Sequence, residues 1–118
     1  MADGPLAERH CEPCRAGTPP IAPEAAAQRL NELEGWEIVG GNKSLRKTIV
    51  CKNFVDAASL IQRLVPVAES NDHHPDLHLT DYKHLTIELS THAIGGLSEN
   101  DFILAAKLDR MVAHLQSP

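Results

Sequence analysis

The apolar residues of this chain recur at two different periods. They occupy every second position in 84–90, and in 44–51 the alternating face is Leu45, Lys47, Ile49 and Cys51. This is the period of a half-buried strand. Apolar residues recur three and four positions apart in 54–70 and again after Ser98, which is the period of an amphipathic helix. Because both periods occur within 118 residues, the pattern predicts one domain that mixes helices and strands.

Turn and capping residues set the expected ends of the elements in the first half. A helix is expected to begin at Pro23, because proline suits a first helical turn. It is expected to end at Gly35, a residue typical of helix ends. The Gly-Gly-Asn turn at 40–42 then joins a short strand at 36–39 to the strand at 44–51, which predicts a hairpin.

The second half begins with the longer helix at 54–70. Asn53 is placed to cap its first turn, since Asn side chains accept from the free backbone N–H groups there. Pro66 lies inside this helix and removes one backbone hydrogen bond. We therefore expect a kink near Gln62 without loss of the helix.

A second hairpin and a last helix complete the pattern. Strands are expected at 77–81 and 84–90, and Ser98 followed by Asp101 has the spacing of a capping box at the next helix start. The order is helix, strand, strand, helix, strand, strand, helix. It predicts an α+β fold, with a four-stranded antiparallel sheet and three helices packed on one face.

Composition narrows the class of protein. Apolar residues make up 42% of the chain and aromatic residues only 3%, so the core must be aliphatic. The net charge is −5 and no Lys/Arg cluster stands out, so no direct binding to nucleic acid is expected. No apolar run is long enough to span a membrane, and no secretory signal is recognisable. Three cysteines do not suggest a disulfide framework, so the default location is the cytoplasm.

Residues 1–22 are expected to form an irregular leader before a domain at 23–118. The leader contains four of the eight prolines. Cys11 and Cys14 have the spacing of a zinc knuckle, and His10 could supply a third ligand. A structural zinc site usually needs four ligands and the chain has no second cysteine pair, so we expect no metal there.

The stretch at 69–84 is a candidate functional site, because it contains four of the seven histidines and four acidic residues. His73 and His74 are adjacent, so in extended structure they point to opposite faces and do not easily share one metal ion. His74 and His78 have a helical spacing, but Pro75 begins a region that resembles loop and strand. We therefore expect no metal in this stretch.

Acid–base catalysis is the other interpretation of the same stretch. An ordinary imidazole titrates near pH 6.5 and can give or take a proton at neutral pH. His92, at the end of a strand, and Asp101, at a helix start, could complete such a pocket. Composition does not decide between an acid–base site and a polar loop. Asp101, for example, could serve only as a cap of the last helix.

The spacing of these residues resembles the signature of the pterin-4a-carbinolamine dehydratases. The matching positions are Glu69, His73, His74, Pro75, Tyr82, His92 and Asp101. The neighbouring "ELEGWEIV", "LSTH" and "GLSENDF" are similar to the same family, and "CEPCRAGTPP" resembles a leader found on some bacterial members. The likeness covers about residues 23–115.

The resemblance implies a reaction and a set of roles. It implies dehydration of a 4a-hydroxy-tetrahydropterin in pterin recycling, with no metal or organic cofactor, by a homodimer or homotetramer. His73 and His92 would be general acids, His74 would bind the pterin and could be the base, and Asp101 would orient the histidines. The residues lining the pocket would be Asp72, His73, His74, Pro75, Ser90, Thr91, His92 and Ala93. Glu69 and Tyr82 would support the site.

Two positions depart from the family pattern. Pro66 is unexpected in a helix that leads into the site, and Asn100 stands where some members have a basic residue before the aspartate. Two other functions stay open on the same fold. One is a non-catalytic, coactivator-like role through protein contacts, and the other is a role in molybdopterin metabolism.

Overall fold

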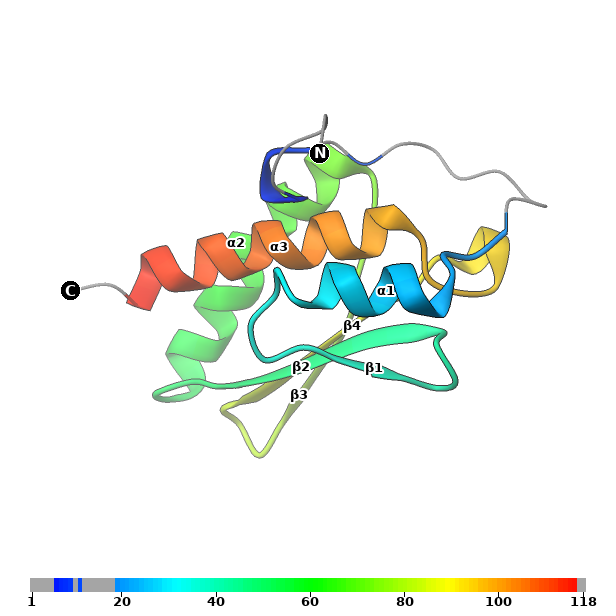
Figure 1. Ribbon diagram of the computed structural model, residues 1–118. Coiled ribbons are helices and arrows are strands. Elements are labelled where there is room, and N and C mark those ends of the chain that lie inside the picture. Colours follow the sequence, from blue (N-terminus) through cyan, green and yellow to red (C-terminus); the bar gives the residue numbers. More distant parts are fainter. Residues whose placement is uncertain (1–5, 10, 12–18, 117–118) are drawn as a thin grey trace.

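The computed structural model describes residues 6–9, 11 and 19–116, and Figure 1 shows how their helices and strands are arranged. The regular elements are α1 (Pro23–Leu30), β1 (Glu37–Val39), β2 (Ser44–Val50), α2 (Phe54–Asn71), β3 (Asp76–Thr80), β4 (His84–Leu89) and α3 (Glu99–Gln116). Two single turns of 3₁₀ helix are η1 (Leu6–Glu8) and η2 (His92–Ile94). Neither single turn was expected from the sequence.

The four strands form one antiparallel sheet in the order β1-β2-β4-β3. The two hairpins meet through β2 and β4, where Leu45 lies opposite Leu89 and Ile49 lies opposite Leu85. The helices cover one face of this sheet, with α3 lying beside α1 above the strands (Figure 1). The expected α+β fold with a four-stranded antiparallel sheet and three helices is confirmed.

The core lies between this face and the helices. Every second residue of β4 is buried, as the alternating pattern requires. The sheet, α2 and α3 supply most of the fully buried side chains, namely Leu45, Leu64, Leu85, Ile87, Leu89, Phe102, Ile103, Leu104 and Leu108. On the opposite face Thr48 is exposed and Thr86 is partly exposed to solvent, and their hydroxyls lie 2.9 Å apart.

Helix α1 is shorter than the sequence predicts. It ends at Leu30 and not at Gly35, and the next backbone hydrogen bonds run three residues back, from Glu32 to Arg29 and from Leu33 to Leu30. The N–H of Glu34 donates instead to the carboxylate of Asp109 on α3, at 3.0 Å. A tertiary contact therefore takes up the backbone group that a longer helix would have used.

Helix α2 begins as predicted, because the Asn53 side chain accepts from the N–H of Asp56 at 2.8 Å. It continues through Pro66 to Asn71, and the kink expected near Gln62 stays a prediction. Strand bounds differ from the sequence prediction by about one residue at several ends. Among the described residues, no helix is long and apolar enough to cross a membrane.

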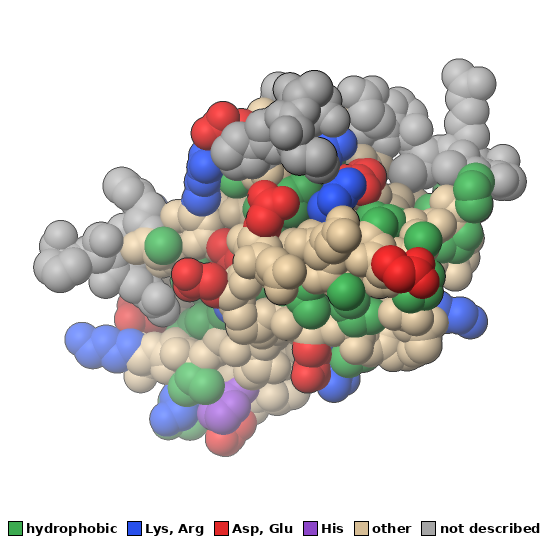
Figure 2. Space-filling model, in the orientation of Figure 1, with side chains coloured by type: hydrophobic (Ala, Val, Ile, Leu, Met, Phe, Trp, Pro, Cys, Tyr) green, Lys and Arg blue, Asp and Glu red, His purple; other side chains and the backbone are tan. Residues whose placement is uncertain are grey.

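Charged side chains are mixed over the face shown in Figure 2, where Lys and Arg lie dispersed among acidic side chains. Several of them pair, as Arg29 does with Glu99 and Arg46 with Glu37. The expectation that this chain does not bind nucleic acid directly stays a prediction.

Candidate active site

Asp101 is a fully buried carboxylate in the first turn of α3. Its Oδ2 accepts hydrogen bonds from the backbone N–H of Ser98 and from the hydroxyl of Thr91, each at 2.9 Å. Its Oδ1 lies 2.6 Å from Nε2 of His73. A buried charge is tolerated only when its oxygens are paired, and here both oxygens have partners.

His73 reaches Asp101 because of how α2 ends. Asp72 adopts the left-handed conformation (φ 49°, ψ 41°) and its N–H bonds back to Ala68 and Glu69. The N–H of His73 also bonds to the carbonyl of Ala68. This turn reverses the chain at the helix end. It directs His73 inward, where its side chain is only 11% exposed.

The donor and the acceptor of each hydrogen bond around Asp101 can be assigned. Since the Thr91 hydroxyl donates to Asp101, it must accept from the Ser98 hydroxyl 2.8 Å away. The Ser98 oxygen in turn accepts from the N–H of Asn100 at 3.2 Å. With Asp101 as an acceptor, His73 donates from Nε2, so Nδ1 is the ring nitrogen left for a substrate.

A second histidine–carboxylate pair lies one residue further along the chain. Nε2 of His74 is 2.5 Å from Oε2 of Glu69, at the end of α2. This pair is open to solvent, with side chains 55% and 66% exposed. His73 and His74 thus bind different carboxylates, one inside the fold and one on its surface.

His92 opens the single turn η2 and is exposed. Its loop is closed by a bridge between Thr91 and Gly96 and by the N–H of Ile21, which donates to the carbonyl of Leu97 at 2.9 Å. A side chain at Gly96 would come within 3.1 Å of Pro20, so the loop fits closely against the chain before α1. Because Thr91 binds Asp101, His92 is attached to the same cluster by its backbone.

The remaining residues predicted for the site divide into two groups. Asp72, Pro75, Ser90 and Ala93 lie within one or two residues of the histidines or of Thr91, at the ends of α2 and β4. Tyr82 lies in the β3–β4 turn, at the opposite end of that hairpin, where its ring is exposed and contacts Lys83. The structure therefore does not bring Tyr82 to the His73–Asp101 pair within one chain.

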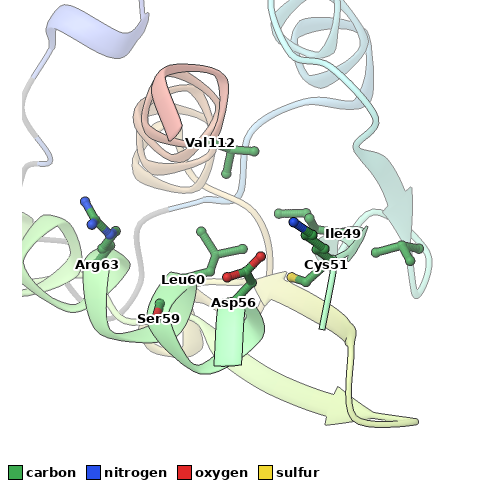
Figure 3. Close-up of a pocket in the computed structure, with 9 residues that line it drawn as sticks. Ile49, Cys51, Asp56, Ser59, Leu60, Arg63 and Val112 are labelled. Atoms are coloured by element: carbon green, nitrogen blue, oxygen red, sulfur yellow. The ribbon is translucent and has the colours of Figure 1, made fainter. Parts of the chain in front are cut away.

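A cavity of about 380 Å³ lies elsewhere in the described part of the chain (Figure 3). It lies between the end of β2, α2 and α3, and its lining includes Cys51, Asp56, Arg63 and Val112. Burial, and secondarily the negative charge of Asp56, raise the pKa of the Cys51 thiol. A raised pKa keeps a thiol protonated and unreactive. We place the candidate site at the histidines because His73 and His74 are each hydrogen-bonded to a carboxylate, whereas this thiol is held protonated.

Metal ligation has limited support in the described part of the chain. No group of three or more His, Cys, Asp or Glu side chains there is arranged to hold an ion. Of the residues considered for zinc in the leader, His10 and Cys14 lie outside the described residues. Cys11 is described, and its thiol donates to the backbone carbonyl of Asn100 at 3.6 Å.

Ser98 is the site residue that sequence reasoning left out. It was assigned to the helix cap alone, yet its N–H and hydroxyl contact Asp101 and Thr91. The capping-box spacing was the available signal, because in a capping box the third residue reaches back to the N–H of the cap. Asp101 both accepts from the N–H of the cap residue Ser98 and binds His73, so capping does not exclude a role in the site.

The chain has clear relatives. A family model described as pterin 4 alpha carbinolamine dehydratase matches residues 19–111. A protein from Nitrosospira multiformis, whose name assigns it provisionally to these dehydratases, is 40% identical over 106 residues, which are 90% of this chain and 91% of the relative. Pterin-4-alpha-carbinolamine dehydratase 2, mitochondrial, from Arabidopsis thaliana is 41% identical over 109 residues, which are 90% of this chain and 58% of the relative.

Solved structures share the fold. A protein from Brucella melitensis described as a transcriptional coactivator/pterin dehydratase superposes with a TM-score of 0.72 at 26% identity, over 78% of this chain and 97% of that one. A pterin dehydratase-like RuBisCO assembly factor of the alpha-carboxysome shows the fold alone, with a TM-score of 0.56 at 17% identity, over 68% of this chain and 92% of that one. The family match over most of the chain and the close relatives agree with the resemblance seen in the sequence. The chain therefore belongs to the pterin-4a-carbinolamine dehydratases, a family of hydro-lyases.

Proposed function

We propose that this chain dehydrates a 4a-hydroxy-tetrahydropterin to quinonoid dihydropterin and water by histidine-based acid–base catalysis. In this reaction the C4a–O bond breaks and the departing oxygen takes up a proton. The C4a=N5 double bond forms as N5 loses its proton to a base, for which His74 is the candidate. No electrons pass to or from another molecule, and the proposed steps use no metal or organic cofactor. The product is the oxidised pterin that a reductase would recycle for aromatic amino acid hydroxylation.

The observation that supports this proposal best is the buried His73–Asp101 pair. Asp101 holds Nε2 of His73 at 2.6 Å, so the imidazole has one orientation and one nitrogen left for the substrate. A positioned imidazole contributes about 10²–10⁴-fold to a proton-transfer reaction. In this proposal His73 acts in its imidazolium form: Nε2–H stays on Asp101, and Nδ1 delivers its proton to the departing hydroxyl.

His74 and His92 take the complementary roles. Both side chains are exposed, which leaves them accessible to a ligand that arrives from solvent. We assign pterin binding to His74, with Glu69 as the carboxylate that holds its ring. His92 is the second general acid, and its backbone is attached to the cluster by Thr91. Asp72, Pro75, Ser90 and Ala93 would line the pocket around the pterin.

The test is a direct assay. Enzymatically generated 4a-hydroxy-tetrahydropterin would be supplied, and its dehydration followed for the intact chain and for His73→Ala, His74→Ala and His92→Ala. The intact chain should accelerate the reaction and each variant should lose activity, while far-ultraviolet circular dichroism reports that each still folds. No acceleration by the intact chain over the uncatalysed rate would refute the enzymatic proposal.

A second candidate function is binding to other proteins, and exposed apolar side chains on α2 favour it. Phe54, Val55 and Val65 lie on this helix with large exposed fractions. Exposed apolar side chains gathered on one element often mark a protein interface. A homodimer or homotetramer formed through α2 would cover them, and a coactivator-like partner could use the same helix.

Light scattering after size exclusion would test this second proposal. The intact chain should elute as an oligomer, and Val55→Asp should shift it to the monomer, because a buried unpaired charge opposes association. Val50→Asp, which changes an exposed apolar residue on β2, is the matched control. A monomeric intact chain would refute the homo-oligomer. The expected cytoplasmic location stays a prediction.

A further inference from the structure

The described part of the N-terminal leader, residues 6–9 and 11, packs along α3 and is called the N-terminal strap below. Leu6 is 2% exposed and forms part of the main core. Its N–H donates to the Glu32 carboxylate at 3.3 Å, and the carbonyl of Ala7 accepts from the Lys107 ammonium at 2.9 Å. The strap is therefore anchored to the domain although the sequence predicted only an irregular leader.

The strap continues from this anchor to the two ends that carry His73 and Asp101. The N–H of Cys11 donates to the side-chain oxygen of Asn71 at 3.5 Å, and its thiol donates to the carbonyl of Asn100 at 3.6 Å. Asn71 is the last residue of α2, and Asn100 directly precedes Asp101. Cys11 therefore bridges the same two helix ends that the His73–Asp101 hydrogen bond joins.

A stronger contact fixes the start of α3. The guanidinium of Arg9 lies 3.1 Å from the carboxylate of Glu99, and both side chains are partly shielded from solvent. Arg29 binds the same carboxylate at 3.0 Å. Glu99 is the first residue of α3 and follows Ser98, whose N–H binds Asp101. A displacement of Glu99 would thus be passed directly to the carboxylate that orients His73.

We propose that the N-terminal strap sets the geometry of the His73–Asp101 pair, with Arg9 as a positioning residue that acts through Glu99. The kinetic part of this inference, a lower kcat, rests on the proposed function. The structural part, a changed position of the His73 ring, does not. The pair joins two helices, so its length depends on how far apart their ends are held. Misplacing a catalytic group by 1 Å can cost about 100-fold in rate, so a smaller shift is expected to be measurable.

The strap contains its own control. Glu8 is the neighbour of Arg9, and it too forms one ion pair with α3, at 3.4 Å from Arg110. Arg110 lies eleven positions beyond Glu99 along α3, away from the site. Arg9→Gln and Glu8→Gln each remove one ion pair between the strap and the same helix, but only the first does so beside Asp101. Arg9→Lys keeps the charge and serves as the rescue variant.

Two readouts separate positioning from simple stabilisation. The first is the dehydration assay, where we expect Arg9→Gln to lower kcat by about 3- to 10-fold with little change in KM. The second is the NMR spectrum of the His73 ring, identified by its loss in His73→Gln. Arg9→Gln should shift these signals, Glu8→Gln should leave both readouts at the wild-type values, and Arg9→Lys should restore most of both. Cys11→Ala should cause a smaller shift, because its contacts are long.

Equal effects of Arg9→Gln and Glu8→Gln on kcat and on the His73 signals would overturn the proposal. This holds whatever the thermal unfolding midpoints of the two variants. If the intact chain proves inactive, the proposed function fails. The His73 signals alone then decide whether the strap positions the His73–Asp101 pair. Signals that move in Arg9→Gln but not in Glu8→Gln would then still support the strap as a positioning element. Unmoved signals in both variants would overturn it.

Discussion

Two histidine–carboxylate pairs involve adjacent histidines of this protein and differ in burial and in the donors around the carboxylate. His73 and Asp101 are 2.6 Å apart, and His74 and Glu69 are 2.5 Å apart. Asp101 is completely buried, whereas the Glu69 side chain is 66% exposed. Water screens an exposed pair and competes for its atoms, so contact distance alone does not measure what such a pair contributes.

The surroundings of the two carboxylates explain the difference. Asp101 accepts two further hydrogen bonds, from Thr91 and from the backbone of Ser98, so with His73 three residues from two segments of the chain hold its position. The described residues give Glu69 no comparable set of side-chain donors. The buried pair suits a group that must keep one geometry during proton transfer. The exposed pair suits a group that must stay accessible to a ligand arriving from solvent.

Asp101→Asn should produce the largest effect, because it breaks the buried pair at its centre. An amide offers one acceptor oxygen where the carboxylate used two, so at least one buried donor loses its partner. We expect the dehydration rate to fall by about 100-fold or more. Urea titration should show a loss of about 2–4 kcal/mol in the free energy of unfolding. An unfolding free energy equal to that of the wild type would contradict the assignment of Asp101 as a buried, fully paired charge.

His73→Gln and His74→Gln compare the two pairs directly. We expect His73→Gln to lower kcat by about 100-fold and to cost about 1–3 kcal/mol of stability, since Asp101 is left buried without its partner. His74→Gln should mainly raise KM, with a stability change below about 0.5 kcal/mol. Steady-state kinetics with urea titration would check both. The same kcat and stability losses in the two variants would remove the distinction.

Thr91→Val sharpens the comparison by removing one support of the buried pair while keeping the shape of the side chain. Asp101 and Ser98 each lose a partner, so we expect a loss of about 1–2 kcal/mol in unfolding free energy. Thr86→Val is the matched control, because it removes a hydroxyl that pairs with Thr48 on the open face of the sheet. Its cost should stay within about 0.5 kcal/mol. Comparable costs at the two positions would show that burial is not the deciding factor.

Glu69→Gln should have the smallest effect. It removes the charge from the exposed pair, where solvent screens the interaction, so we expect a stability change of about 0–0.5 kcal/mol. The dehydration rate should stay within about threefold of the wild type, measured in the same assay. A loss as large as that of Asp101→Asn would mean that Glu69 takes part in the chemistry, contrary to its assigned supporting role.

The sequence predicted the elements well where local chemistry decides them. Asn53 caps α2, and the alternation in β4 gives its buried face, as their patterns indicated. The end of α1 was predicted wrongly because Asp109, 75 residues away from Glu34, takes up a backbone N–H. No local pattern contains that information. The roles of the individual histidines stay predictions.

By itself the sequence determined the fold class and the family, because hydrophobic period, caps and motif spacing are local properties. For the same reason it named the candidate site residues, which stay predictions. Only the tertiary structure decided which histidine binds which carboxylate, since His73 and His74 are chemically identical neighbours. The left-handed turn at Asp72 sends one ring to Asp101 inside the fold and leaves the other with Glu69 at the surface. The tertiary structure also decided that the leader contacts the ends of α2 and α3 through Cys11, because this contact depends on how the helices pack.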